Sequence, residues 1–240
     1  MADIDMVRRN MSYICSQLSA LWKNISLLIK FLCISILCFY FLSYSEQAVD
    51  VISVTPGHII PPQFWIWTAF THCFMELHLW EVIVDWMTLG LCGKLLEPLW
   101  GTLEMFTFFG IVNLSVAVLS TMIYFFAYAL TSNPHYLFSV QIHGLAGYIA
   151  GVIVAVKQIM PEHVVLKTPV GKILNRNLPL LIFLCSVLLW LLSSVISIVD
   201  SSHPVMFFCG LISSWVYLRF YQLHTNGMRG DMAESFSFAT

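Results

Sequence analysis

Six long apolar runs constrain what this chain can fold into more than any other feature. Four of them are clear candidates for membrane spans: Ile25–Ser43, Gly101–Leu130, Leu178–Val199 and Val205–Tyr221. Two more, Leu79–Leu96 and Ser139–Met160, carry polar residues in their first turns and are otherwise apolar. A helix of about 20 apolar residues can cross a bilayer. The sequence therefore predicts an all-α integral membrane protein, a bundle of six transmembrane helices.

The distribution of Lys and Arg supports this count, because short cytosolic loops are enriched in these residues. With six spans and a cytosolic amino terminus, all 11 lie on one side of the membrane or at its helix ends. The other side carries acidic residues and no Lys or Arg. We therefore expect both termini in the cytosol. Residues 1–24 form a cytosolic segment, 25–222 the membrane domain, and 223–240 the start of a longer cytosolic tail.

Composition excludes several functions. Hydrophobic residues make up 59% of the chain and charged residues only 10%, against about 25% charged residues in soluble domains. The net charge of -2 leaves no basic excess for binding nucleic acid. The seven cysteines include no Cys-x-x-Cys pair and fall mostly in apolar runs, where they act as small hydrophobic residues. We expect no disulfide framework, no metal site and no cofactor.

The segment 44–78 is predicted to form a long lumenal loop between the first two spans. Its second half, from Phe64 to Met75, is too aromatic for a solvated loop and too polar for a seventh span. We expect it to lie in the lumenal interface, with Trp65 and Trp67 at the level of the lipid headgroups.

Two acidic residues near the start of the second run are the first candidates for a polar site. Glu81 and Asp85 are spaced i, i+4 and project from one face of a helix. A charged residue at membrane depth costs about 2.5–3.5 kcal/mol on insertion scales, and it usually faces the bundle interior or water. The alternative is that both lie at the lumenal rim, reach water there and brace the preceding segment.

A second polar group, Gln141 and His143, is predicted at the start of the fourth span on the same lumenal side. His72 and Glu76 come from the interfacial segment nearby, so a metal cluster can be drawn, but these residues match no compact ligand spacing. A hydrogen-bond network joining the loop with the second and fourth helices fits better, because buried polar groups need partners.

The fourth span also carries Gly144, Gly147 and Gly151. Gly147 and Gly151 are four residues apart, a spacing of small residues that lets two helix backbones approach closely in a membrane. We therefore expect this helix to be central, with the glycines serving either packing alone or the binding of another transmembrane segment.

Several of these motifs together resemble the rhomboid superfamily of intramembrane proteases. Gly93, Glu97 and Gly101 are similar to the Gly-x-x-x-Glu-x-x-x-Gly pattern of its second helix. Trp67 to His72 resembles part of its first loop, Gly144 to Gly147 its Gly-x-Ser-Gly motif, and Cys209-Gly210 its glycine-rich sixth helix. The resemblance covers about residues 64–220 and implies a six-helix rhomboid-like fold.

The chemical positions of that pattern differ here. Ala146 stands at the position of the rhomboid serine and Phe207 at that of the histidine. His203 lies one helical turn, about 5.4 Å, from the histidine position, too far to replace it. Glu81 and Asp85 take the places of the His and Asn that help to bind the oxyanion, which two carboxylates would repel. The resemblance therefore implies a pseudoprotease and no enzymatic activity.

Within the superfamily the resemblance is strongest to the Golgi family of transmembrane protein 115. It is carried by stretches such as Leu95–Gly101 and Ser213–Gln222. This implies a multi-pass Golgi membrane protein that supports Golgi-to-ER retrograde transport, with indirect effects on protein glycosylation. The implied partners are membrane lipids, transmembrane cargo, cytosolic trafficking machinery and a second copy of the chain. Two alternatives stay open: a transporter or proton pathway, and a non-serine intramembrane enzyme that uses Glu81, Asp85 and His143.

Overall fold

The computed structural model describes residues 26–59, 61, 63–168, 171–196, 202–223 and 230. The predicted cytosolic segment 1–24 lies outside this part of the chain, and so does the tail except for Leu223 and Gly230.

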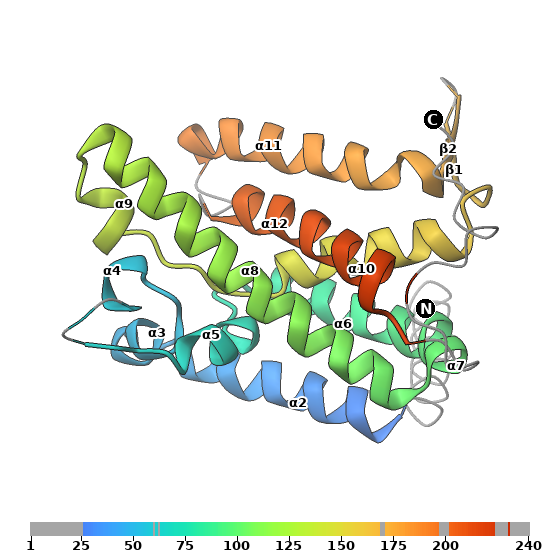
Figure 1. Cartoon of the computed structure of the whole chain (residues 1–240), viewed down its shortest axis with the longest axis horizontal. Coiled ribbons are helices and arrows are strands. Elements are labelled where there is room, and N and C mark those ends of the chain that lie inside the picture. The colour runs from blue at the N-terminus through green and yellow to red at the C-terminus, as the bar shows by residue number, and fades with distance from the viewer. Residues whose placement is uncertain are drawn as a thin grey trace, which may run out of the picture.

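Within the described residues the fold is a bundle of six long helices (Figure 1). These helices are α2 (Leu27–Leu42), α6 (Leu79–Leu95), α8 (Thr102–Thr131), α10 (Ala146–Ile159), α11 (Leu178–Ile196) and α12 (His203–Val216). A π-helical turn, η3 (Tyr217–Tyr221), extends α12. Each helix coincides with one of the six apolar runs to within two residues or lies inside it, so hydropathy locates the helices well.

The fourth helix starts later than the sequence predicts, at Ala146 instead of Ser139. Ile142 exchanges two backbone hydrogen bonds with Val54, at 2.8 and 2.9 Å. Gly144 has a φ of +90°, which is incompatible with a right-handed helix. The residues from Val140 to Gly144 are therefore not part of the helix, and they carry Gln141, His143 and Gly144 to the front of α10.

The expectation of an all-α fold omits a β-hairpin between α10 and α11. Its strands, β1 (Val164–Thr168) and β2 (Gly171–Leu174), pair antiparallel. The β-branched residues of β1 and the glycine that starts β2 are typical of such a hairpin. A 3-10 turn, η2 (Asn175–Asn177), leads from β2 into α11.

The segment 44–78 contains four short helices: α3 (Glu46–Ile52), α4 (Pro56–Ile59), α5 (Thr68–Thr71) and η1 (His72–Phe74). Trp67 and Thr71 donate side-chain hydrogen bonds to the carbonyl oxygens of Val51 and Ile52. The aromatic half of this segment is therefore attached to α3. Two other short helices, α7 (Glu97–Trp100) and α9 (His135–Phe138), flank α8.

Helix α10 packs against α12, α8, α11 and α6. The closest approach joins α10 to α12, where a Cβ added to Gly210 would collide with the backbone of Gly147. A Cβ on Gly147 would lie 2.6 Å from Val116 of α8 and 3.1 Å from the carbonyl oxygen of Met206. Since no side chain separates α10 from α12 at this level, the two glycines set the distance between these helices.

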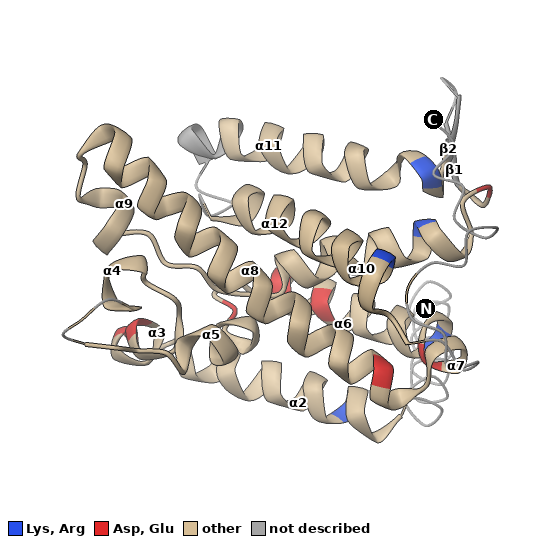
Figure 2. Cartoon of the chain, viewed as in Figure 1, with Lys and Arg blue, Asp and Glu red and all other residues tan. Residues whose placement is uncertain are grey.

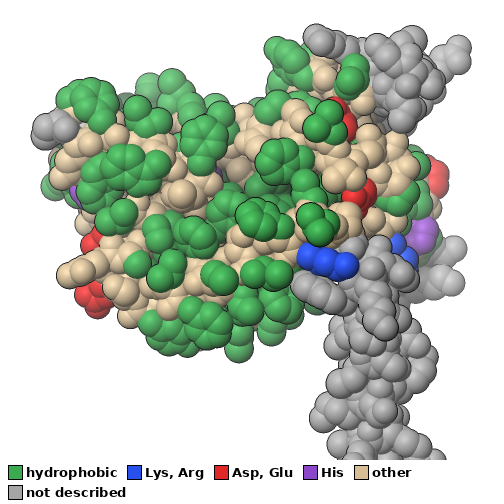
Figure 3. Space-filling model, turned by 90° about the horizontal axis from the view of Figure 1, so that it is seen from below, with side chains coloured by type: hydrophobic (Ala, Val, Ile, Leu, Met, Phe, Trp, Pro, Cys, Tyr) green, Lys and Arg blue, Asp and Glu red, His purple; other side chains and the backbone are tan. Residues whose placement is uncertain are grey.

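The surface and the charges match a protein that lies in a membrane. Large apolar side chains are exposed on the long helices, among them Leu103 at 82% and Met87 at 71% (Figure 3). By length and hydropathy, α8 and the continuous helix His203–Tyr221 can each cross a bilayer. Among the described residues, Lys and Arg gather at one end of the bundle (Figure 2). The cations described there are Lys30, Lys94, Lys157, Arg176 and Arg219.

The glycine contact predicts a specific sensitivity of the bundle. Gly210→Ala forces α12 away from α10, and overpacking of this kind costs about 1–3 kcal/mol. We expect the apparent melting temperature in detergent to fall by about 3–10 °C. Gly110→Ala on α8 is the matched control, because nothing lies within 4 Å of the added Cβ. Equal melting temperatures for the two variants would contradict the close approach at Gly147.

Candidate functional site

Six ionisable side chains from five parts of the fold meet inside the bundle. We call His72, Glu76, Glu81, Asp85, His143 and His203 the polar cluster. They come from η1, the turn after it, α6, the segment before α10, and the first residue of α12. All are buried except His203, whose side chain is 13% exposed. The cluster therefore joins the loop to the second, fourth and sixth long helices.

Glu81 connects the start of α6 to the start of α12. One carboxylate oxygen, Oε2, accepts a hydrogen bond from the backbone N–H of His78 at 3.1 Å, as in a capping box. The other, Oε1, lies 3.3 Å from Nε2 of His203. A negative charge is favourable in the first turn of a helix, where the dipole is positive. Glu81 therefore caps α6 and pairs with α12 at the same time.

Glu76 holds the segment that precedes α10. Its Oε1 accepts the backbone N–H of Leu145 at 3.0 Å. Gly144 lies against the carboxyl group, since a Cβ there would be 2.7 Å from Oε1 and 2.9 Å from Oε2. Two features favour glycine at position 144. The φ is positive, which residues with a Cβ rarely adopt, and the backbone lies directly against the carboxyl group of Glu76, where a Cβ would collide.

Glu76 and Asp85 form a hydrogen-bonded carboxyl pair. Burial is the main cause that raises the pKa of Glu76 well above its usual value, and the nearby charge of Asp85 raises it further. Two carboxyl groups in hydrogen-bond contact cannot both be ionised cheaply, so the pair retains one proton. The interior polar site predicted for Glu81 and Asp85 is therefore built around three carboxyl groups.

His72 belongs to the part of the polar cluster that comes from the segment 44–78, and its imidazole is neutral. Its Nδ1 lies 3.1 Å from the carbonyl oxygen of Ala69, and its own carbonyl accepts the N–H of Gly144 at 2.8 Å. Complete burial lowers the pKa of His72 to about 4. The rings of His143 and His203 meet edge to face, 6.0 Å apart. These contacts connect η1 to the segment before α10, and that segment to the start of α12.

Two predicted site residues lie apart from the cluster and attach the loop. The side-chain amide of Gln141 donates to Oδ1 of Asp50 at 2.7 Å. Nε1 of Trp67 donates to the carbonyl oxygen of Val51 at 3.1 Å, and the indole is half exposed. Gln141 and His143 were expected to act together, whereas Gln141 contacts α3 and His143 the start of α12.

Ala146 and Phe207, which the resemblance places at the rhomboid serine and histidine, have side chains with no nucleophile and no base. Ala146 is the first residue of α10 and is partly buried against the core. Phe207 is buried on α12 and stacks on Phe183 of α11, with ring centroids 6.5 Å apart. Ala146 directly precedes Gly147, and Phe207 lies three residues before Gly210. Within the described residues, no three His, Cys, Asp or Glu side chains are grouped to hold a metal ion.

Sequence reasoning gave Glu76 only as one residue of a conceivable metal cluster and did not expect His203 in the site. Glu76 follows an aromatic segment and carries no motif, and only its burial against Gly144 reveals its role. His203 was considered only as a replacement for a catalytic histidine. Its pairing with Glu81 depends on how α12 packs beside α6, which sequence spacing does not encode.

Comparison with known proteins agrees with this fold. Residues 30–240 match a family described as eukaryotic integral membrane protein (DUF1751). The chain belongs to this family. It is 44% identical over 225 residues to transmembrane protein 115 of Homo sapiens and 45% identical to that of Bos taurus. It is 27% identical over 198 residues to rhomboid-like protein 19 of Arabidopsis thaliana.

These alignments cover 93% of this chain for the two mammalian proteins and 82% for the plant protein. They extend over only 61% of each mammalian relative and 62% of the plant relative. The chain is thus an integral membrane protein similar to transmembrane protein 115 and to a rhomboid-like protein. It spans about three fifths of the length of these relatives.

The carboxyl pair predicts a pH effect on stability. Because the pKa of Glu76 is raised in the fold, the contribution of Glu76 to wild-type stability decreases as pH rises above about 4.3, the usual value for Glu. Glu76→Gln keeps the bond to Leu145 and removes this titration. We expect the melting temperature of Glu76→Gln relative to wild type to increase between pH 4.5 and 8. Glu76→Ala loses the buried bond and should destabilise by about 1–3 kcal/mol.

The control is Glu46→Gln, which neutralises an exposed carboxylate in the first turn of α3. A difference between Glu76→Gln and wild type that stays constant across this pH range would show that Glu76 does not titrate in the fold.

Proposed function

We propose that this chain is a non-catalytic rhomboid-like recognition protein of the Golgi membrane. In this proposal all six long helices cross the bilayer, and both termini face the cytosol. The bundle binds transmembrane segments of other membrane proteins. Through its cytosolic parts it supports Golgi-to-ER retrograde transport, with indirect effects on protein glycosylation.

The observation that carries the proposal is the close backbone contact between α10 and α12, together with the residues next to it. The backbones of Gly147 and Gly210 meet there without intervening side chains. The neighbouring positions hold Ala146 and Phe207, which supply neither a nucleophile nor a base. A scaffold that keeps its close helix packing and lacks both reactive groups is suited to binding a transmembrane segment without cleaving it.

The polar cluster supports the same reading. An acyl-transfer enzyme needs hydrogen-bond donors aimed at a developing negative charge. Here the nearby polar groups include the acidic side chains Glu76, Glu81 and Asp85. Their partners are a backbone N–H, a histidine and each other. This arrangement stabilises the fold and disfavours an oxyanion.

The topology is supported by charge. Cytosolic loops carry an excess of Lys and Arg, and the described cations gather at one end of the bundle (Figure 2). We assign that end to the cytosol. The Golgi location and the role in retrograde transport rest on the resemblance to the transmembrane protein 115 family.

A second candidate, a proton pathway or a non-serine enzyme, is favoured by the convergence of Glu81, His203 and the Glu76–Asp85 pair. A pathway would need polar groups that continue toward the other side. Further along α6, the hydroxyl of Thr88 donates to the carbonyl oxygen of Val84 in the same helix, in an exposed hydrogen bond, so Thr88 does not extend the cluster. We therefore rank this candidate second.

Photocrosslinking tests the proposed binding site. A genetically encoded diazirine amino acid at Ala146 should capture single-pass membrane proteins in Golgi membranes. The matched control places the same residue at Phe31, which is 65% exposed on α2. Capture of the same proteins at both positions, or of lipid alone at Ala146, would contradict the proposal.

The absence of a nucleophile is tested separately. Neither the wild-type protein nor Ala146→Ser should react with a fluorophosphonate probe, because Phe207 cannot accept a proton from a serine. An active rhomboid protease serves as the positive control. Labelling of the wild-type protein would reveal a reactive serine and would overturn the non-catalytic assignment.

A further inference from the structure

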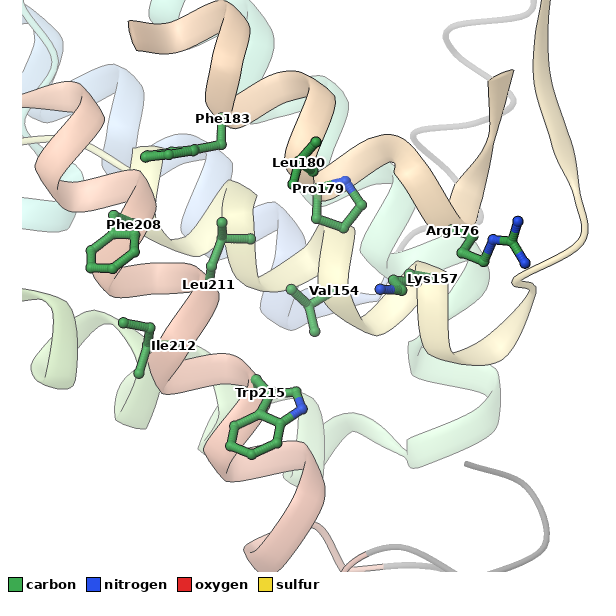
Figure 4. Close-up of a pocket in the computed structure, with 10 residues that line it drawn as sticks. All are labelled: Val154, Lys157, Arg176, Pro179, Leu180, Phe183, Phe208, Leu211, Ile212 and Trp215. Carbon is green, nitrogen blue, oxygen red and sulfur yellow. The ribbon is translucent and has the colours of Figure 1, made fainter. Parts of the chain in front are cut away.

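An apolar groove with two cations at one end runs between α10, α11 and α12 (Figure 4). We call it the α11 groove. Its volume is about 590 Å³, within the range of about 300–1,000 Å³ that is common for ligand sites. Most of its lining is aliphatic or aromatic and includes Val154, Leu180, Phe183, Phe208, Leu211 and Trp215.

The two cations are Lys157, in the last turn of α10, and Arg176, in η2 just before α11. Figure 4 shows both at one end of the groove and Phe183 and Phe208 toward the other. The positive charges lie close enough to repel each other. Among the residues that the structure describes, no acidic side chain lines the groove. An anion placed between these two cations would therefore be stabilised.

The position in the fold adds to this preference. Helix α11 starts at Leu178, two residues after Arg176. Its first turn brings the positive end of a helix dipole to the same place. Between positions 157 and 176 the chain contains four Lys or Arg residues and one acid, Glu162. Glu162 is exposed in the turn after α10 and does not line the groove.

The apolar part of the α11 groove must also be filled. In a bilayer, an unfilled hollow forfeits dispersion contacts, so lipid chains fill it. From Arg176 to Phe183 the groove follows seven residues of helix, about 10 Å. A helix of that length with its side chains occupies roughly 800 Å³, more than the groove offers. An acyl chain is narrower and fits.

We infer that the α11 groove binds an anionic glycerophospholipid. The phosphate lies against Lys157 and Arg176, and an acyl chain lies between Leu180, Phe183 and Phe208. This site is separate from Ala146 and from the polar cluster. It depends only on the chain being an integral membrane protein, and it does not rest on the proposed role in transport.

The same molecule provides an internal control for this inference. A second groove of about 610 Å³ lies between α8 and α12 and is lined by residues such as Leu114, Val118 and Val216. Its lining contains no charged side chain within the described part of the chain. Both grooves should accept acyl chains, and only the α11 groove should select the headgroup.

The test is native mass spectrometry of the full chain, released from detergent in the presence of phosphatidylserine or of phosphatidylcholine with identical acyl chains. We expect tighter binding of phosphatidylserine. A Lys or Arg near an anionic headgroup contributes about 1 kcal/mol. Lys157→Gln/Arg176→Gln should therefore weaken phosphatidylserine binding by about 30-fold and weaken phosphatidylcholine binding much less, because the choline group offsets the charge of its phosphate.

The matched control is Lys94→Gln, an exposed cation near the end of α6 that lies outside the groove. It should bind both lipids like the wild-type protein. Wild-type binding that does not distinguish the two lipids would overturn the inference even if the double variant were unstable. An unchanged affinity in a folded double variant would also overturn it.

A photoreactive phosphatidylserine, with a diazirine in its acyl chain, locates the bound lipid in phosphatidylcholine vesicles. We expect adducts on peptides that contain Phe183 or Phe208, reduced in the double variant. Equal labelling of α8 near Val118 would remove the assignment to the α11 groove. Competition by glycerophosphoserine, which has no acyl chain, would show a soluble-anion site, and crosslinks between two copies of the chain would show a protein interface. Either result would overturn the inference.

Discussion

The contact between the backbones of α10 and α12 is the constraint on which the rest of the structure depends. Gly147 and Gly210 bring the two helices together without intervening side chains, and α8 closes the third side through Val116. In lipid, little hydrophobic driving force holds helices together, so close packing and polar contacts must do so. The position of α10 then determines where the segment before it meets the loop, and where α11 can pack.

The polar cluster is the second set of contacts that fixes the bundle. Its directional hydrogen bonds and its ion pair hold neighbouring elements in defined relative positions. Glu76 receives the backbone of Leu145, Glu81 pairs with His203, and the carbonyl of His72 accepts the N–H of Gly144. Buried polar groups are costly when unsatisfied, so each of these bonds specifies one arrangement of neighbouring elements. Such a network explains why carboxyl groups persist inside a chain whose surface is so apolar.

Sequence reasoning predicted the helices better than the cluster, and the reason is physical. An apolar run identifies a helix by itself, so the second run, Leu79–Leu96, matches α6 almost residue for residue. The start of α10 was wrong because hydropathy is insensitive to backbone conformation, and Gly144 ends the pattern through its positive φ. Glu81 and Asp85 were recognisable as acids in an apolar run. The meeting of His203 with them depends on packing between elements that are distant in sequence, and that of Glu76 depends on the conformation of the turn before α6.

The hairpin of β1 and β2 lies between α10 and α11 in the chain. Lys157 precedes it and Arg176 follows it, and both line one end of the α11 groove. The N–H of Asn175 donates to the carbonyl oxygen of His163 at 3.0 Å, and the N–H of Arg176 donates to that of Pro161 at 3.3 Å. These backbone bonds join the end of α10 to the start of α11, so the end of the groove that carries the two cations keeps its backbone shape whatever occupies the groove.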